Sequence, residues 1–508
     1  MTRAATEIGA GLAPAREART IRAGELIHVV GAAGAGASGA ALLAHDAGAQ
    51  VTGCDRGGPS PYTVALDAAG IRIARSHSPA HLRSKPPPDR LAVTKALTAV
   101  NADHPELVAA REAGIPLEPW QQVVADAAVG RRLVAVAGTH GKSTTAGWLT
   151  PVLVSAGADP SAFVGALLGP EVTGGLPATA RWGRGEAFVV EADEYAGNFD
   201  AYRPSVAALT SIDWDHPDLF PDRAAIVDAV ESWLRAADAA AGEPPTVIAN
   251  LADTGVKELL ERLTDWPGRI ITVAMSRRPD DGAADVPETA DIVGTIIGSK
   301  RTGTTIEITG LTDDSVRIEL LTAGRHNVAN ALVVAATGRE LGLDGGAIAT
   351  GLASFPGVGR RLEYKGEAGD VVVYDDYGHH PTAIRATMDA LRQREPDRRV
   401  WAVYEPLTYH RTAAFLGAFA DALATADAVA IADIWAGRDR DMRITSASAL
   451  AQAIAKRRPE IPIAAPGSVD ATANWLAGEV RSGDAVLVMG GGQSYRIGER
   501  LLEILKER

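Results

Sequence analysis

The chain has 508 residues, of which 46% are hydrophobic and 22% are charged, and its net charge at pH 7 is −13. This length suits about three domains at roughly 150 residues each, and the acidic balance argues against a general nucleic-acid binder. Cys54 is the only cysteine, which excludes a disulfide framework and a cysteine zinc site within one chain and fits a reducing compartment.

The N-terminal segment MTRAATEIGAGLAPAREART has no apolar core long enough for a signal peptide. No apolar run in the chain reaches the ~18 residues of a membrane span. We therefore expect a cytoplasmic protein with a flexible tail over residues 1–23 and no membrane contact.

Short apolar runs alternate with alanine-rich helical stretches, which is typical of α/β architecture with mainly parallel sheets. The runs form three groups, and they predict domains over residues 24–130, 131–323 and 324–508. The predicted strands lie in LIHVVG (26–31), AQVTGCD (49–55) and REAGIPLEPW (111–120); in RRLVAVAG (131–138), EAFVVEADE (186–194), SVAALTSIDWDH (205–216), TVIAN (246–250), RIITVAM (269–275) and short segments over 290–321; and in VVVYDD (371–376), RVWAVYEP (399–406), DAVAIADIW (427–435) and AVLVMGGG (485–492).

A glycine cluster follows the first predicted strand. Gly34, Gly36 and Gly39 have the G-x-G-x-x-G spacing that lets a backbone turn tightly and approach a phosphate at a helix N-terminus. Asp55, which ends the next strand, could accept hydrogen bonds from a ribose or a base. Taken alone, this pattern indicates an NAD-dependent oxidoreductase; in a chain rich in alanine and glycine it also fits simple tight packing.

The segment GTHGKSTT (138–145) follows one predicted strand and precedes a helix, as a phosphate loop does, although Val136 stands where the general pattern has its first glycine. In such a loop, backbone N–H groups surround the phosphates, Lys142 neutralises them, and Ser143 or Thr144 reaches Mg²⁺. The loop residues concerned are Gly138, Thr139, His140, Gly141, Lys142, Ser143 and Thr144.

Two further polar residues lie at the ends of predicted strands in the same domain, residues 131–323. Glu191 is a carboxylate that could bind Mg²⁺, and His216 lies among acidic residues, which favours a metal ligand over a structural histidine. The alternative for the whole region is an ordinary glycine turn with a surface lysine.

The motifs GTHGKST, EADE (191–194), WDH (214–216) and GRHNVANAL (324–332) occur in the order found in the Mur ligases, and the sequence resembles this family from about Gly24 onward. The family's phosphate loop lacks the first glycine, which accounts for Val136. The resemblance implies an ATP-dependent amide-bond-forming ligase of peptidoglycan synthesis, with ATP and Mg²⁺ as cofactors. It also implies a Rossmann-like N-terminal domain, a central domain like a P-loop ATPase with a mainly parallel sheet, and a Rossmann-like C-terminal domain.

The resemblance also implies roles for residues of the ATP site. Lys142 would contact the phosphates, Ser143 and Glu191 would hold one Mg²⁺, and His216 would hold a second. His326 and Asn330, four residues apart and so on one helix face, would contact adenine or ribose; a helix N-terminal polar cluster is the alternative. In FPGVGRRLEY (355–364), Arg360 or Arg361 could stabilise phosphate charge, and we expect Arg360 to be catalytic.

The segment DDYGHHPTAI (375–384) resembles that of the family members that join L-alanine to UDP-N-acetylmuramate. Tyr377, His379 and His380 would then lie near the amino acid. In YEPLTYHRT (404–412), Arg411 matches an arginine that binds the amino-acid carboxylate, whereas Thr408 replaces a second one. The sugar nucleotide would contact the first domain through Gly34, Ala35, Gly36, Gly39 and Asp55.

The implied reaction begins when ATP phosphorylates the lactyl carboxylate, and the amine of L-alanine then attacks the acyl phosphate. No lysine lies between Lys142 and Lys257, whereas family members that add later residues carry a modified lysine there. Three alternatives remain: a recycling ligase that attaches an intact peptide to the same sugar nucleotide, an NAD-dependent oxidoreductase, and a non-catalytic nucleotide-binding regulator. The segment VTKALTAVNADHPE (93–106) departs from the family's serine-rich loop, and the sequence does not indicate an oligomeric state.

Overall fold

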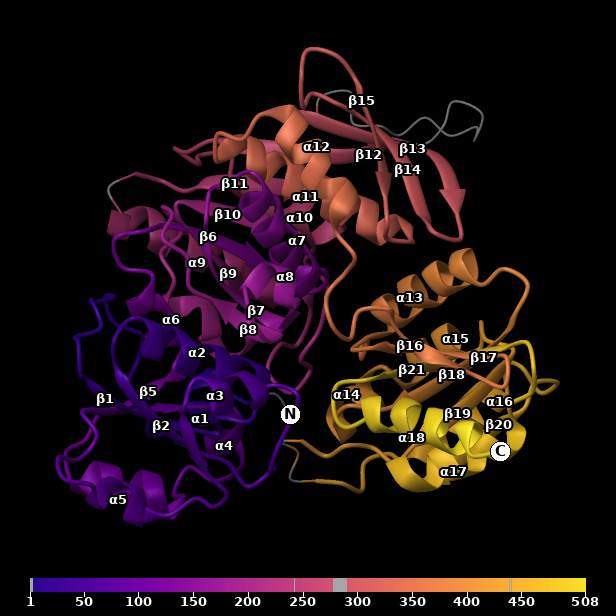
Figure 1. Cartoon of the computed structure of the whole chain (residues 1–508), viewed down its shortest axis with the longest axis horizontal. Helices are drawn as coiled ribbons and strands as arrows, with labels where there is room; N and C mark the ends of the chain where they lie inside the picture. Colours follow the sequence, from indigo (N-terminus) through magenta and orange to yellow (C-terminus); the bar gives the residue numbers. More distant parts are fainter. Residues whose placement is uncertain (1–2, 242, 277–289, 438, 440) are drawn as a thin grey trace.

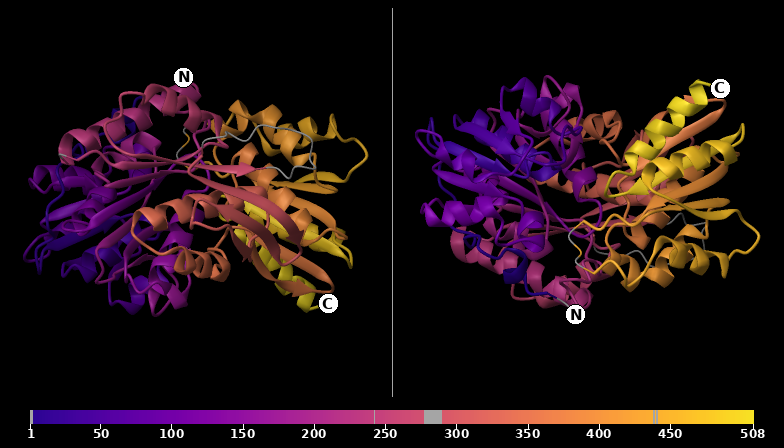
Figure 2. Two further views of the ribbon diagram at one scale, coloured as in Figure 1. Left: turned by 90° about the horizontal axis from the view of Figure 1, so that it is seen from above. Right: turned by 90° about the horizontal axis from the view of Figure 1, so that it is seen from below.

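The computed structural model describes residues 3–241, 243–276, 290–437, 439 and 441–508. Three β-sheets follow one another along the chain, each with helices packed on it, which confirms the predicted α/β class (Figure 1). The first domain (indigo) and the C-terminal domain (yellow) lie at opposite ends of the long axis, and both lie against the central domain (Figures 1 and 2). None of the helices in the described ranges has the length and apolar character needed to cross a membrane.

The first domain holds a five-stranded parallel sheet in the order β3-β2-β1-β4-β5. Its strands are β1 (Leu26–Val30), β2 (Gln50–Cys54), β3 (Arg72–Ala74), β4 (Arg90–Val93) and β5 (Leu117–Pro119). Its helices are α2 (Ala35–Asp46), α3 (Val64–Ala68), η1 (Pro79–Arg83), α4 (Lys95–Val100), α5 (Pro105–Glu112) and α6 (Trp120–Ala127). Alternate residues of β1 enter two cores, Val29 on the face of α2 and Val30 on the face of α5.

The central domain holds a ten-stranded sheet in the order β15-β14-β13-β12-β11-β10-β6-β9-β7-β8, parallel from β13 to β7 and antiparallel at both edges. Its strands are β6 (Arg132–Ala137), β7 (Ser161–Leu168), β8 (Ala178–Arg181), β9 (Ala187–Ala192), β10 (Val206–Leu209), β11 (Thr246–Asn250), β12 (Ile270–Ser276), β13 (Ile292–Lys300), β14 (Gly303–Thr309) and β15 (Val316–Leu320). Its helices are α7 (Lys142–Ser155), α8 (Pro170–Thr173), η2 (Tyr195–Ala201), α9 (Arg223–Ala241) and α10 (Thr254–Arg262).

The C-terminal domain holds a six-stranded sheet in the order β16-β17-β21-β18-β19-β20, parallel except for β16. Its strands are β16 (Glu363–Ala368), β17 (Val371–Asp376), β18 (Arg399–Glu405), β19 (Ala428–Ala432), β20 (Ile463–Gly467) and β21 (Asp484–Gly490). Its helices are α13 (Pro381–Arg394), α14 (Tyr409–Ala414), α15 (Leu416–Leu423), α16 (Ala447–Ala455), α17 (Val469–Glu479) and α18 (Tyr495–Lys506).

The boundary that we predicted between residues 323 and 324 lies too early. Helices α11 (Arg325–Glu340) and α12 (Gly345–Ser354) belong to the central domain, because their apolar residues join the core formed by the sheet and α7. Leu332 and Leu352 are both fully buried there. The C-terminal domain therefore begins only after α12.

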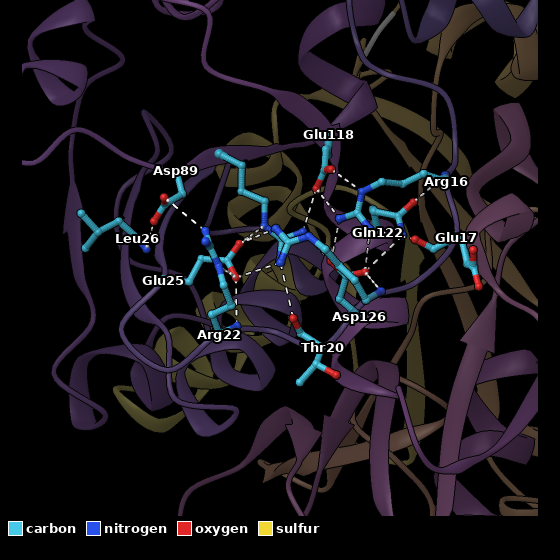
Figure 3. Close-up of polar contacts among 12 residues, drawn as sticks. Arg16, Glu17, Thr20, Arg22, Glu25, Leu26, Asp89, Glu118, Gln122 and Asp126 are labelled. Atoms are coloured by element: carbon cyan, nitrogen blue, oxygen red, sulfur yellow. Dashed lines mark hydrogen bonds and ion pairs between the residues drawn. The ribbon is translucent and has the colours of Figure 1, made fainter.

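The prediction of a flexible tail over residues 1–23 is wrong for the described part of this segment. Ile8, which ends the short helix α1 (Ala5–Ile8), is fully buried. The Arg16 guanidinium forms ion pairs at 2.7 Å with both Glu118 and Asp126 (Figure 3). These carboxylates are buried, and a paired cation offsets the cost of removing them from water. The partners lie about 100 residues further along the chain, so local sequence could not reveal them.

Candidate active site

The phosphate-loop motif connects β6 to α7, as predicted, and its glycines are required by close packing. Gly138 and Gly141 have φ angles of 131° and 83°, in the left-handed region that favours glycine. A Cβ atom on Gly138 would lie 2.5 Å from the carbonyl oxygen of Ser211, and one on Gly141 would lie 2.5 Å from the Asn330 side chain.

The backbone N–H groups of Thr139 and His140, which we expected to surround the phosphates, already donate to Ser211. The first turn of α7, where Lys142, Ser143 and Thr144 lie, offers further N–H groups for a phosphate. The first N–H groups of a helix have no partner within the helix, and its positive end favours an anion.

Lys142 lies at this helix start, within a group of acidic side chains. Its Nζ donates to Gly138 O at 2.5 Å and to Glu194 Oε2 at 3.1 Å, and it lies 3.5 Å from Asp193 Oδ1. Burial acts to lower the pKa of Lys142, but Glu194 and Asp193 outweigh burial and raise the pKa above its ordinary value. Lys142 therefore keeps its positive charge throughout the neutral range.

Ser143 and Glu191 lie close enough together to hold one magnesium ion between them, as expected. The Ser143 hydroxyl donates to Glu191 Oε1 at 3.0 Å. Neighbouring oxygens on an octahedral Mg²⁺ with bonds of ~2.0–2.1 Å lie roughly 2.9 Å apart, so the spacing fits. Arg361, from the C-terminal domain, donates to the same Ser143 oxygen at 3.0 Å and brings a second cation to the loop.

His216 lies in a separate group, with Asp193 and Glu194, in which one ligand atom from each residue lies within 4.8 Å of the others. Burial acts to raise the pKa of Asp193, but Lys142 and His216 outweigh burial and hold it below its ordinary value. The His216 Nδ1 lies 3.2 Å from the Arg411 guanidinium, which can only donate. A neutral His216 in this arrangement therefore carries its proton on Nε2, and it would bind a metal only after Arg411 moves or the proton leaves.

Side chains of the C-terminal domain contact the segment that follows β10. Arg411, which is only 1% exposed, donates to Asp215 Oδ1 at 2.8 Å. Burial acts to raise the pKa of Asp215, but Arg411 holds it well below its ordinary value. His380 Nε2 lies 3.0 Å from Trp214 O and is another direct contact between the two domains. Arg411 is thus an interdomain ion-pair partner, while its buried Nη1 makes no hydrogen bond within the described residues.

His326 and Asn330 lie in the first turns of α11, beside the phosphate loop. The His326 Nδ1 is buried and has no hydrogen-bond partner in the described part of the chain. Burial lowers the pKa of His326 to about 4, so the imidazole is neutral at pH 7. An unpartnered buried nitrogen is costly unless a ligand satisfies it. This feature fits the expected contact with adenine or ribose.

The glycine cluster of the first domain has packing roles at two of its three positions. A Cβ atom on Gly36 would lie 2.2 Å from the Trp120 ring, and one on Gly39 would lie 2.8 Å from Phe163 of the central domain. Gly34 and Ala35 begin α2. The Asp55 carboxylate accepts from the N–H groups of Ala33 at 3.0 Å and Gly57 at 2.7 Å, so Asp55 also orders this loop.

The two adjacent arginines of the third domain have different surroundings. Arg360 forms an ion pair with Asp375 at 3.0 Å and donates to Gly490 O, within its own domain. Its guanidinium lies 5.0 Å from the Tyr377 ring centroid. Arg361, rather than the expected Arg360, reaches Ser143 and thus the phosphate loop.

His379 follows Tyr377 in the same loop, with the two ring centroids 5.3 Å apart and nearly perpendicular. Burial lowers the pKa of His379 well below its ordinary value. His379 is therefore neutral at pH 7, and its ring can contact a ligand without adding charge to the site.

A cavity extends from the first domain to Glu191 and Asp193 of the central domain. It is lined by Gly36, Trp120, Gln121, Phe163, Gly165, Glu191, Asp193, Asn198 and Tyr202. Lys95, for which no role was predicted, lies on the same interface and donates to Ala196 O at 2.6 Å. Burial lowers the pKa of Lys95 to about 8, with Asp200 and Asp193 acting against this shift. Because the cavity reaches from Gly36 to Glu191, a ligand bound at the glycine cluster has room to extend toward Glu191.

Three family models match the chain in succession. The model described as "Mur ligase family, catalytic domain" matches residues 26–132, "Mur ligase middle domain" matches residues 136–338, and "Mur ligase, glutamate ligase domain" matches residues 360–492. The gap between the last two models contains α12, in agreement with the domain boundary given by the packing.

Curated relatives match over nearly the full length. The UDP-N-acetylmuramate–L-alanine ligase of Frankia casuarinae is 35% identical, with 94% of this chain and 97% of the relative covered. The ligase of the same name from Kineococcus radiotolerans is 36% identical, with 95% and 96% covered.

Two solved structures share the whole fold. The UDP-N-acetylmuramate–alanine ligase of Thermotoga maritima has a TM-score of 0.74 at 23% identity and covers 95% of this chain and 99% of its own. A murein peptide ligase from Psychrobacter arcticus has a TM-score of 0.70 at 25% identity, with 96% and 99% covered. The ordered motifs, the three successive domain matches and the full-length relatives agree, and the chain belongs to the Mur ligase family.

Proposed function

We propose that this enzyme joins L-alanine to the lactyl carboxylate of UDP-N-acetylmuramate, with ATP converted to ADP and phosphate. The observation that carries the proposal is the cavity that connects Gly36 of the first domain with Glu191 and Asp193 of the ATP site. A sugar nucleotide held at the glycine cluster would direct its carboxylate toward the transferring phosphate. The curated relatives that match most of the chain bear the name of this activity.

The side chains of the phosphate loop suit phosphoryl transfer. Lys142 would neutralise the phosphates, and Arg361 would add positive charge at Ser143 when the C-terminal domain docks. Ser143 and Glu191 would hold one Mg²⁺. His216 and the neighbouring acids would hold a second Mg²⁺ once Arg411 has moved away from His216. Bound Mg²⁺ would stabilise the charge that develops on the transferring phosphate.

The C-terminal domain would bind the amino acid whose amine attacks the acyl phosphate. The Tyr377 and His379 rings contact each other, and the adjacent His380 contacts Trp214 of the central domain. Arg411 would offer its unpartnered Nη1 to the carboxylate of the amino acid. Docking of the domains would exclude water from the acyl phosphate, which water would otherwise hydrolyse.

The oxidoreductase alternative rests on the glycine cluster and Asp55 alone, and it leaves the segments GTHGKSTT and GRHNVANAL unexplained. A peptide-recycling ligase remains the second candidate, because the Psychrobacter arcticus murein peptide ligase shares the fold over 96% of this chain.

Phosphate release with UDP-N-acetylmuramate, ATP and a panel of amines distinguishes the two candidates. L-alanine is expected to support the highest kcat/KM, with weaker turnover of glycine and L-serine. A pocket distinguishes side chains that differ by one small group by only ~1–3 kcal/mol, and Thr408 supplies no second positive charge. Turnover with a tripeptide but none with free L-alanine would establish the recycling ligase instead.

A further inference from the structure

Four side chains able to bind a metal ion meet inside the first domain, and none of them belongs to the expected ATP, sugar or amino-acid sites. His28 lies on β1, Cys54 ends β2, His81 lies in η1, and Glu106 lies in the first turn of α5. One ligand atom from each lies within 4.8 Å of each of the others. Cys54 and Glu106 are fully buried, and His28 is 2% exposed.

The topology of the sheet brings these residues together. His28 pairs with Thr52 in the parallel register of β1 and β2, and Val30 pairs with Cys54, so both potential ligands point to the same face. Helices η1 and α5 cover that face, and they bring His81 and Glu106 to it. Four of the chain's 11 histidines, His28, His77, His81 and His104, are gathered in this region.

The distances between the ligand atoms fit a tetrahedral site. His28 Nε2 lies 3.4 Å from Cys54 Sγ and 3.3 Å from Glu106 Oε1, and Cys54 Sγ lies 3.7 Å from the same Glu106 oxygen. With bonds of ~2.0–2.3 Å, the ligand atoms around a tetrahedral zinc ion lie roughly 3.3–3.8 Å apart. His81 Nδ1 is closer, at 2.7 Å from Glu106 Oε1, as in a direct hydrogen bond.

We propose that His28, Cys54, His81 and Glu106 form a binding site for a divalent transition-metal ion, with Zn²⁺ as the preferred ion. Thiolate, imidazole and carboxylate are the ligand types that Zn²⁺ takes in proteins. A thiolate and a carboxylate would carry two negative charges, which equal the charge of the ion, and the two imidazoles would be neutral. The buried site would thus have no net charge, whereas the Glu106 carboxylate alone is costly to bury.

A neighbouring hydroxyl orients one ligand. The Thr52 Oγ1 lies 2.8 Å from His28 Nδ1 and can accept a hydrogen bond from its N–H, which leaves the lone pair of Nε2 facing the site. His77 Nδ1 lies 3.1 Å from Cys54 Sγ and can donate to the thiolate. These contacts would be retained when the ion binds.

The ion must displace a proton from Cys54. Zn²⁺ binds the thiolate form of cysteine, so binding would release this proton to the solvent. The exclusion of a cysteine zinc site in the sequence analysis was therefore too broad: it holds for sites with several thiolates, whereas a mixed site needs only one.

Cobalt(II) substitution in the full-length protein tests this proposal. The protein is treated with a chelator, transferred to magnesium-free buffer and titrated with Co²⁺, and Zn²⁺ affinity is then measured by competition with a chromophoric chelator. We expect one Co²⁺ per chain with a thiolate-to-cobalt charge-transfer band. Glu106→Gln should weaken Zn²⁺ binding by at least about tenfold, and Cys54→Ser should remove the band.

Two control variants locate the ion. His104→Asn removes a histidine from the same region but keeps the N-cap of α5, and His216→Ala disrupts the acidic group near the phosphate loop; both should keep the band. The proposal fails if the wild-type protein shows no charge-transfer band at one equivalent of Co²⁺, or if Glu106→Gln binds Zn²⁺ as tightly as the wild type.

Discussion

Lys142→Ala is expected to abolish measurable turnover. The Lys142 ammonium lies at the start of α7. Under the proposed function it would face the phosphates, where negative charge shifts during transfer. Removing a single preorganised donor from a transition state costs about 10²–10³ in kcat, and Lys142 carries a full charge. The loss should appear in kcat as well as in the KM for ATP, in a steady-state assay of phosphate release.

The same variant needs a test of folding, because Glu194 and Asp193 lose their cationic partner. Glu194 is buried, and it can take up a proton when Lys142 is absent, so the fold should survive; thermal unfolding checks this. Lys257→Ala, on the exposed face of α10, is the matched control and should behave as wild type. Near-normal activity of a folded Lys142→Ala protein would remove the phosphate-loop assignment.

Arg411→Ala is expected to lower kcat/KM for L-alanine by about 30-fold or more. Truncating one partner of a buried charge pair costs about 2–5 kcal/mol, and Arg411 is buried against Asp215. Under the proposed function the KM for L-alanine should rise far more than the KM for ATP, since Nη1 would bind the amino-acid carboxylate. Arg392→Ala, which removes a half-exposed arginine of the same domain, serves as the control.

A double variant separates the two roles of Arg411. In Arg411→Met with Asp215→Asn, no unpaired charge remains buried, so thermal stability should recover toward the wild-type value. The high KM for L-alanine should persist, because the guanidinium is still missing. Recovery of both properties would show that Arg411 acts only as an interdomain ion-pair partner.

The motif GTHGKSTT predicted the strand, loop and helix around the phosphate-loop segment, because these three elements are contiguous in the sequence. The apolar runs predicted most of the other strands, but they missed the eight-residue strand β7 (Ser161–Leu168) as well as the short strands β3 (Arg72–Ala74) and β4 (Arg90–Val93). The contacts between domains could not be predicted. Arg361 meets Ser143 across 218 positions of sequence and Arg411 meets Asp215 across 196, and only the folded chain selects Arg361 over Arg360.

The glycine cluster shows a different limit. Gly36 and Gly39 fit a phosphate-binding pattern, yet the structure explains both by the close approach of Trp120 and Phe163. Spacing alone cannot distinguish a glycine that admits a ligand from one that admits a neighbouring ring. The prediction for the N-terminal segment was wrong for a different reason. It missed an ordered segment, because Arg16 has distant buried partners that no local pattern indicates.

The most direct test of the account follows oxygen through the reaction. UDP-N-acetylmuramate labelled with ¹⁸O in its lactyl carboxylate is incubated with the enzyme, ATP, Mg²⁺ and L-alanine, and the products are analysed by mass spectrometry. The account predicts equal amounts of ADP, phosphate and UDP-N-acetylmuramoyl-L-alanine, with one ¹⁸O atom transferred to each phosphate, because the carboxylate oxygen leaves with it. Amide formation with unlabelled phosphate, or no amide product with any amino acid, would contradict it.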